Sequence, residues 1–224
     1  MIEAYFNSAY TYLDQWIYMD RELRNSLGFR EGDVPNEDSA RSALVRAATY
    51  YGVSRNFKTE RNSPRLGEAW TALKQIGKPN SPEEAVKAVK ELMGALQKHY
   101  QKELCSAASK FLWLRFGSPI IIYDTIAWNW MCNAGGCLKN DGYDQFCKGW
   151  NKEFENRRAE IAKACAGLPS IRKFLRPNDV SDSELLEVIS SEWFTERVFD
   201  HFMLNAEEWS RRREREGDPT TSVQ

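Results

Sequence analysis

Apolar side chains recur along most of the chain at steps of three and four residues, which is the spacing of one helix face. The clearest run is Ala40, Ala43, Leu44, Ala47, Ala48 and Tyr51. Polar stretches rich in glycine and proline interrupt the pattern at residues 28–36, 52–64, 77–79, 117–119, 133–142 and 167–179. The pattern therefore predicts an all-α protein of about eight or nine helices.

Two of the expected helices begin at recognisable capping residues. Ser81 precedes Pro82, and proline is favoured at the first position of a helix because it has no N–H group to satisfy. Ser181 and Glu184 have the spacing of a capping box, in which the two residues satisfy each other's backbone amides. These signals predict helices that start near residues 82 and 182.

The length and composition suit a globular protein. With 224 residues, 42% of them apolar, and eight tryptophans, the chain can bury a substantial core. We expect one domain of two lobes, about residues 1–100 and 101–210, with a charged, flexible tail at residues 211–224. The chain lacks a run of about 18 apolar residues, and residues 1–10 carry an acidic residue where a signal peptide would be basic, so we expect a cytoplasmic protein that does not contact a membrane. We also expect a monomer.

The five cysteines do not suggest a metal site. No two of them form a close CxxC pair, so neither zinc nor an iron–sulfur cluster finds its usual ligand spacing. In a reducing cytosol they would mostly be buried thiols. We therefore expect no metal and no cofactor.

The formal net charge of −1 argues against a protein that coats nucleic acid, since phosphate binding requires many cationic contacts. Any contact with DNA must come from local clusters. One cluster holds Arg55, Lys58, Arg61 and Arg65, and a second holds Lys98, Lys102, Lys110 and Arg115. We expect Arg55, Arg61 and Arg65 to bind DNA, and an ordinary solvated surface is the alternative for both clusters.

Residues 104–130 carry the candidate chemistry. They join a short helix, the apolar run Pro119, Ile120, Ile121, Ile122 and Tyr123, and a second helix that begins after an aspartate. The apolar run is too short to form a sheet alone, so we expect a buried extended connector. Lys110 should lie about one turn inside a helix that starts near Ser106, where the helix dipole and apolar neighbours disfavour an ammonium ion. Asp124 should cap the second helix with its carboxylate.

This segment resembles the helix-hairpin-helix DNA glycosylases, and more specifically the bacterial proteins similar to 8-oxoguanine DNA glycosylase. The hairpin of that superfamily reads approximately L-P-G-V-G-T-K-x-A, and residues 104–110, LCSAASK, align with it without a gap. Ile122, Tyr123 and Asp124 occupy the place of the P-V-D connector. Here Cys105, Ser106 and Ala108 replace the proline and both glycines, and glycines in that hairpin let backbone amides approach a phosphate.

The resemblance implies a two-lobed helical bundle with a central DNA-binding cleft and an enzyme that excises a damaged or modified base. Lys110 would attack the sugar and Asp124 would assist, with a possible nick of the strand by lyase chemistry. The flipped base and its DNA would contact Trp113, Tyr123, Trp128, Ser106 and Ser109. The resemblance includes both DNA repair and antiviral defence against phage DNA.

Two other functions fit the same residues. The altered hairpin suits a DNA-binding or sensor protein that has the fold without the reaction. The chain also suits a helical interaction protein of a bacterial conflict system, in which Lys110 and Asp124 are purely structural. For each aromatic residue the alternative is a place in the core.

Overall fold

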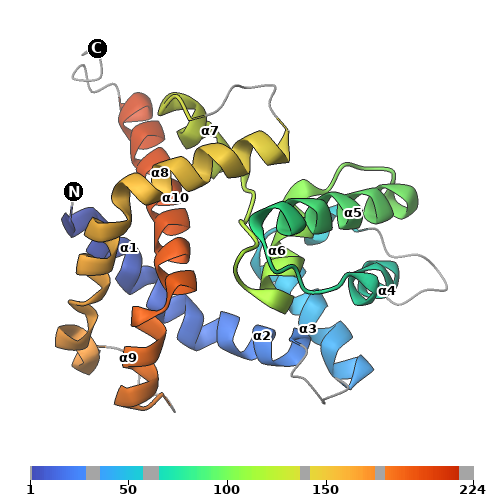
Figure 1. Cartoon of the computed structure of the whole chain (residues 1–224), viewed down its shortest axis with the longest axis horizontal. Coiled ribbons are helices and arrows are strands. Elements are labelled where there is room, and N and C mark those ends of the chain that lie inside the picture. The colour runs from blue at the N-terminus through green and yellow to red at the C-terminus, as the bar shows by residue number, and fades with distance from the viewer. Residues whose placement is uncertain (1, 29–35, 58–65, 137–141, 175–179, 217–224) are drawn as a thin grey trace. The chain divides into compact units, whose positions relative to one another are not determined.

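The computed structural model describes residues 2–28, 36–57, 66–136, 142–174 and 180–216 (Figure 1). Within these ranges every regular element is a helix, so the all-α prediction is confirmed. No helix in the same ranges is long and apolar enough to cross a membrane. Two of the arginines expected to bind DNA, Arg61 and Arg65, lie outside the described residues.

Contacts divide the chain into two compact units. Unit 1 consists of Met1–Ile17 and Asp124–Gln224, and unit 2 is Tyr18–Tyr123. This grouping differs from two consecutive lobes of residues 1–100 and 101–210, because the first helix packs with the C-terminal half of the chain. Each unit has its own core.

Unit 1 is built around its longest helix. Its elements are α1 (Ile2–Gln15), α7 (Thr125–Asn133), α8 (Tyr143–Cys165), the 3-10 helix η3 (Leu168–Phe174), α9 (Asp182–Ser190) and α10 (Glu192–Glu216). Helix α10 packs against α1, α7, α8 and α9, and α1 also packs against α8 (Figure 1). The helical part of the expected tail is thus the end of α10, and residues 217–224 lie outside the described residues.

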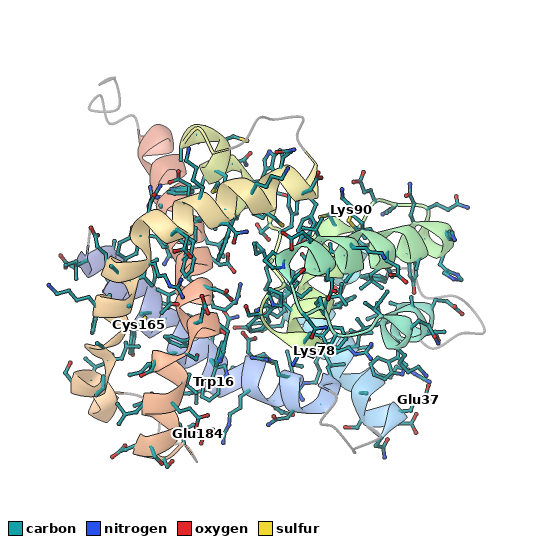
Figure 2. The ribbon with its side chains drawn as sticks, viewed as in Figure 1. Trp16, Glu37, Lys78, Lys90, Cys165 and Glu184 are labelled. Atoms are coloured by element: carbon teal, nitrogen blue, oxygen red, sulfur yellow. The ribbon has the colours of Figure 1, made fainter. Side chains whose placement is uncertain are left out.

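Aromatic rings fill the core of unit 1. The Trp150 ring stacks on Phe154 at 5.0 Å between centroids and meets the edge of Phe199 at 5.3 Å. Cys165 of α8, labelled in Figure 2, is 1% exposed, and burial raises the pKa of its thiol to about 12. Cys105, Cys132 and Cys147 are also thiols outside any disulfide.

Unit 2 surrounds a buried helix. Its elements are α2 (Arg21–Leu27), α3 (Glu37–Tyr50), the 3-10 helix η2 (Ser54–Asn56), α4 (Gly67–Gln75), α5 (Pro82–Tyr100) and α6 (Cys105–Phe116). Helix α6 packs against α5, α2 and α3, and every residue from Ala107 to Arg115 is buried. Its apolar residues do not keep to one face, which is typical of a helix inside a fold. By contrast, α5 has an exposed face, where Lys90 lies (Figure 2).

The capping signals place the helix starts correctly. Ser81 Oγ accepts the Glu84 amide at 3.2 Å, with Pro82 at the first helical position. Ser181 Oγ accepts the Glu184 amide at the same distance. Each predicted break also separates two helices. The sequence did not indicate the π-helix η1 (Trp16–Asp20), which joins α1 to α2 without a break.

Candidate functional site

Lys110 lies in the second turn of α6, which begins one residue before the predicted start at Ser106. Its ammonium nitrogen Nζ is 3.0 Å from Ser106 Oγ and donates to the Tyr51 carbonyl oxygen at 3.4 Å. Nζ also lies 5.8 Å from the centroid of the Tyr51 ring. Lys110 is only 5% exposed. These contacts fix the amine against two neutral oxygens and one aromatic face.

The extended connector is tied to the same helix by Ser109. Its hydroxyl oxygen accepts the Tyr123 amide at 3.0 Å, and its hydroxyl group donates to the Ser106 carbonyl at 3.3 Å. Ile120, Ile121 and Ile122 are buried and lie outside any strand, as predicted. Ser109 is completely buried, so its hydroxyl serves the connector, and a role in DNA binding stays a prediction.

Asp124 is the N-cap of α7, as the sequence predicts. Its Oδ1 accepts the Ile126 amide at 2.9 Å, and its carbonyl oxygen accepts the Trp128 amide at 2.8 Å. The carboxylate is therefore held by backbone donors in one orientation. Asp124 is partly exposed, so part of the side chain remains accessible.

The predicted base-binding aromatics differ in exposure. Trp113 is 1% exposed, with the Arg24 guanidinium 5.1 Å from its ring centroid. Trp128 is 8% exposed and stacks on Phe146 at 5.9 Å. Both rings are part of a core, which was the alternative for each. Tyr123, at the end of the connector, is half-buried.

The two basic clusters also differ. Arg55 on η2 is exposed. The adjacent Phe57 ring lies 4.9 Å from Tyr100, so η2 is near the end of α5, where Lys98 is exposed. Lys110 and Arg115 do not belong to a basic surface, because both are buried. Among the residues of both clusters that the structure describes, the exposed cations are Arg55, Lys98 and Lys102.

Sequence reasoning missed that Asp20 and Tyr51 form a hydrogen-bonded pair beside Lys110. Asp20 is completely buried, and the Tyr51 hydroxyl donates to its carboxylate at 2.8 Å. Asp20 precedes Tyr51 by 31 residues, and Tyr51 precedes Lys110 by 59 residues. No local pattern could have connected them.

A second buried cluster lies in unit 1. Asp200 accepts Trp150 Nε1 at 2.8 Å and Arg197 Nη1 at 2.5 Å. Burial raises the pKa of Asp200, the Arg197 charge opposes the rise, and the Asp124 charge adds to it. The adjacent His201 is 8% exposed, and burial, together with Arg197, lowers its pKa to about 3. This cluster places a neutral imidazole in the core of unit 1 at neutral pH.

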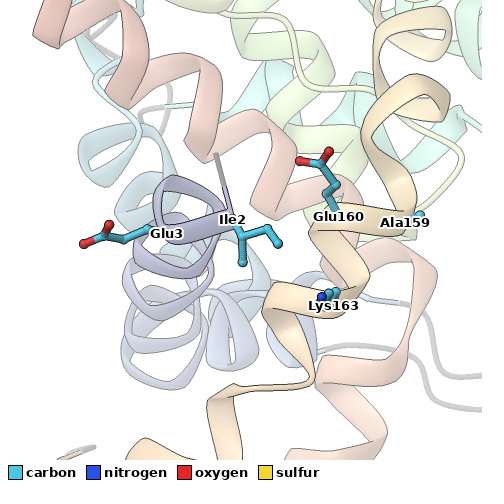
Figure 3. Close-up of a pocket in the computed structure, with 5 residues that line it drawn as sticks. All are labelled: Ile2, Glu3, Ala159, Glu160 and Lys163. Carbon is cyan, nitrogen blue, oxygen red and sulfur yellow. The ribbon is translucent and has the colours of Figure 1, made fainter.

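A pocket of about 530 Å³ lies elsewhere in unit 1. It is lined by Ile2, Glu3, Ala159, Glu160 and Lys163, so α1 and α8 form its walls (Figure 3). Its two carboxylates do not suit a phosphate, and none of the predicted site residues lines it. Within the described ranges, no three His, Cys, Asp or Glu side chains gather in a way that could hold a metal ion.

Comparisons with known proteins do not indicate a function, so any assignment has to rest on the residues described above. No protein-family model, no curated protein and no solved structure matches the chain.

Proposed function

We propose that the chain is a DNA glycosylase that excises a damaged or modified base, with Lys110 as the nucleophile and Asp124 as the assisting carboxylate. The observation that carries the proposal is the buried amine of Lys110, held 3.0 Å from the Ser106 hydroxyl on a buried helix. A lysine amine held in place inside a fold is a suitable setting for an amine nucleophile. The sequence of residues 104–124, with its resemblance to the glycosylase hairpin, supports the same role.

The chemistry needs neither metal nor cofactor. The lone pair of the Lys110 amine attacks C1′ of the sugar, the bond from Nζ to C1′ forms, and the bond from C1′ to the base breaks. The base leaves with the electron pair and takes up the proton that Nζ loses. Opening of the sugar ring gives a Schiff base, and loss of a 2′ proton then expels the 3′ phosphate and nicks the strand.

Asp124 would stabilise the positive charge that develops on the sugar while the base leaves. The Ile126 amide already orients its carboxylate, so little reorganisation is required when that charge appears. The base must first leave the stack, which requires a few kcal/mol and is offset by stacking on an aromatic ring. Tyr123 is the half-buried aromatic residue next to Asp124 and is our choice for that contact.

Covalent trapping tests the proposal. The protein is incubated with DNA that carries oxidised, alkylated, deaminated or phage-modified bases, in the presence of borohydride, and released bases are identified by mass spectrometry. We expect one substrate to give a protein–DNA adduct, and Lys110→Gln to abolish it. Lys163→Gln, at an exposed lysine of α8 that is none of the predicted DNA contacts, is the matched control and should trap at the parental rate. Asp124→Asn should slow base release by about 10² or more.

The identity of the released base also separates DNA repair from phage defence. Release of oxidised guanine would assign repair, and release of a base found only in phage DNA would assign defence. If Lys110→Gln releases base as fast as the parent while Asp124→Asn does not, the enzyme is monofunctional and Asp124 activates water. If both variants retain full activity on a verified substrate, residues 104–130 are not the active site.

A non-catalytic helical protein is the second candidate, and the burial of Lys110 favours it. The Tyr51 carbonyl that Lys110 contacts lies at the C-terminal end of α3, where the helix dipole stabilises a positive charge. Lys110 would then join α6 to α3. This function predicts no trapping on any DNA, whereas a loss of stability in Lys110→Gln is expected under both functions.

A further inference from the structure

Asp20 occupies an unusual position for a buried carboxylate. It ends the π-helix η1 and stands at the N-cap position of α2, yet its side chain makes no capping bond there, and its backbone is helical (φ −66°, ψ −35°). Its carboxylate accepts the Tyr51 hydroxyl at 2.8 Å instead. A buried carboxylate is unfavourable unless it is hydrogen-bonded, and π-helical turns occur often at functional sites.

Tyr51 connects this carboxylate to the amine of Lys110. Its hydroxyl donates to Asp20, its carbonyl oxygen accepts from Lys110 Nζ, and its ring lies beside the same Nζ. One residue therefore contacts Lys110 with its backbone and its ring while Asp20 holds the far end of that ring. All three residues belong to unit 2.

We propose that Asp20 and Tyr51 are positioning residues for Lys110, a role that rests on the proposed function of Lys110 as a nucleophile. The lysine side chain has four rotatable bonds, so its amine is fixed only by what surrounds it. The hydrogen bond to Asp20 fixes the Tyr51 ring, and that ring and the Tyr51 carbonyl confine Nζ. Loss of the hydrogen bond should let the amine leave this place, and displacements of about 1 Å can reduce rates by about 10²-fold.

The test uses variants that remove the Tyr51 hydroxyl or its acceptor on Asp20 and leave the Tyr51 ring in place. Tyr51→Phe removes the hydroxyl and keeps the ring and the carbonyl. Asp20→Leu removes the acceptor, whereas Asp20→Asn keeps an acceptor oxygen and should behave much more like the parent. Tyr50→Phe is the matched control, because the neighbouring tyrosine is 41% exposed.

Two readouts should change in opposite directions. The first is acylation of Lys110 by a small amine-reactive anhydride, measured by peptide mass spectrometry relative to the exposed Lys102 of the same chain. Tyr51→Phe and Asp20→Leu should raise this ratio about tenfold, because the amine leaves its buried position. The second is the single-turnover rate of borohydride trapping on DNA, which should fall about 10 to 10²-fold at unchanged DNA affinity.

The outcomes distinguish this inference from the proposed function. A parental acylation ratio in Tyr51→Phe, whatever the trapping rates, overturns the role of the Asp20–Tyr51 bond. If no DNA traps the parent, the proposed function fails, while a raised acylation ratio still shows that Asp20 and Tyr51 confine the amine. If Asp20→Leu does not fold, the acylation ratio of Tyr51→Phe alone tests the inference.

Discussion

Lys110 carries the proposed chemistry and also contributes to the core of unit 2. The sequence grouped it with Lys98, Lys102 and Arg115 in a local basic cluster, but the residue is only 5% exposed. The reason is that α6 is buried on every side and packs against α2, α3 and α5. Its amine contacts could not be inferred from periodicity, because Tyr51 comes from a distant part of the chain.

The burial of Lys110 leads to a prediction about stability. Lys110→Gln should lower the free energy of unfolding by about 1 to 2 kcal/mol, because the Tyr51 carbonyl and the Ser106 hydroxyl lose a partner inside the fold. Urea denaturation measures the change. Lys102→Gln should change it by less than about 0.5 kcal/mol, as exposed substitutions usually do. Equal effects of the two variants would contradict the observed burial.

His201 should make the folded protein sensitive to acid. In the unfolded chain a histidine binds a proton below its ordinary pKa of 6.5, whereas burial lowers the pKa of folded His201 to about 3. Between these values the unfolded state binds more protons, so the free energy of unfolding falls as the pH falls, by about 1.4 kcal/mol per pH unit once well below 6.5. Above pH 6.5 this contribution is fully present.

The contribution of His201 is measured as the difference in the free energy of unfolding between the parent and His201→Asn. Asp200, whose pKa is raised, acts in the opposite direction but is present in both the parent and His201→Asn. Urea denaturation of each between pH 4 and pH 7 should therefore show a shallower loss of stability in the variant at low pH. Parallel curves would mean that His201 titrates normally in the fold.

At the level of helices, local signals were sufficient for most boundaries. Ser81, Asp124 and Ser181 cap helices where the sequence placed them, because an N-cap depends on amides only two or three residues away. Arg115 shows the limit of such reasoning. It was assigned to a basic surface, but it is buried and its guanidinium donates to the Leu73 and Lys74 carbonyls at the end of α4, so burial lowers its pKa to about 10.

The end of α6 gives a prediction for a single glycine. Gly117 has φ +74° and ψ −147°, and a Cβ atom there would lie 2.6 Å from Arg24 Nη2. Gly117→Ala should therefore lower the free energy of unfolding by about 1 to 3 kcal/mol. Gly77→Ala, where a Cβ atom would meet nothing within 4 Å, is the control and should be nearly neutral in the same urea titration. If Gly117→Ala leaves the free energy of unfolding unchanged, the backbone at the start of the connector can change conformation to accept a side chain.

For the whole molecule, charge limits how DNA can be bound. With a formal net charge of −1, binding must rely on a few local cations, and Arg55, Lys98 and Lys102 are exposed in unit 2. The candidate site could be located by sequence because Lys110 and Asp124 lie on one short segment. The residues around Lys110 could not, because Asp20 comes from η1 and Tyr51 from the end of α3.

The small number of cations predicts a weak dependence of DNA affinity on salt. The logarithm of the association constant should fall with the logarithm of salt concentration with a slope of only a few, since each phosphate contact adds about 0.9. Arg55→Ala combined with Lys98→Ala should reduce the slope by about 2, as measured by fluorescence anisotropy. Lys163→Ala, at the pocket in unit 1, is the control. An unchanged slope in the double variant would place DNA on another surface.

The discontinuous composition of unit 1 has a consequence for the order in which a newly made chain folds. Helix α1 is made before unit 2, but its partners on α8 and α10 are made after unit 2, and Asn205 Nδ2 donates to Ser8 Oγ at 3.2 Å. Unit 2, which is continuous, can assemble while translation proceeds. At synthesis rates of about 5 to 20 residues per second, the apolar face of α1 waits at least several seconds for the helices that cover it. During that interval a chaperone has access to Tyr5 and Tyr12, which the finished protein buries completely.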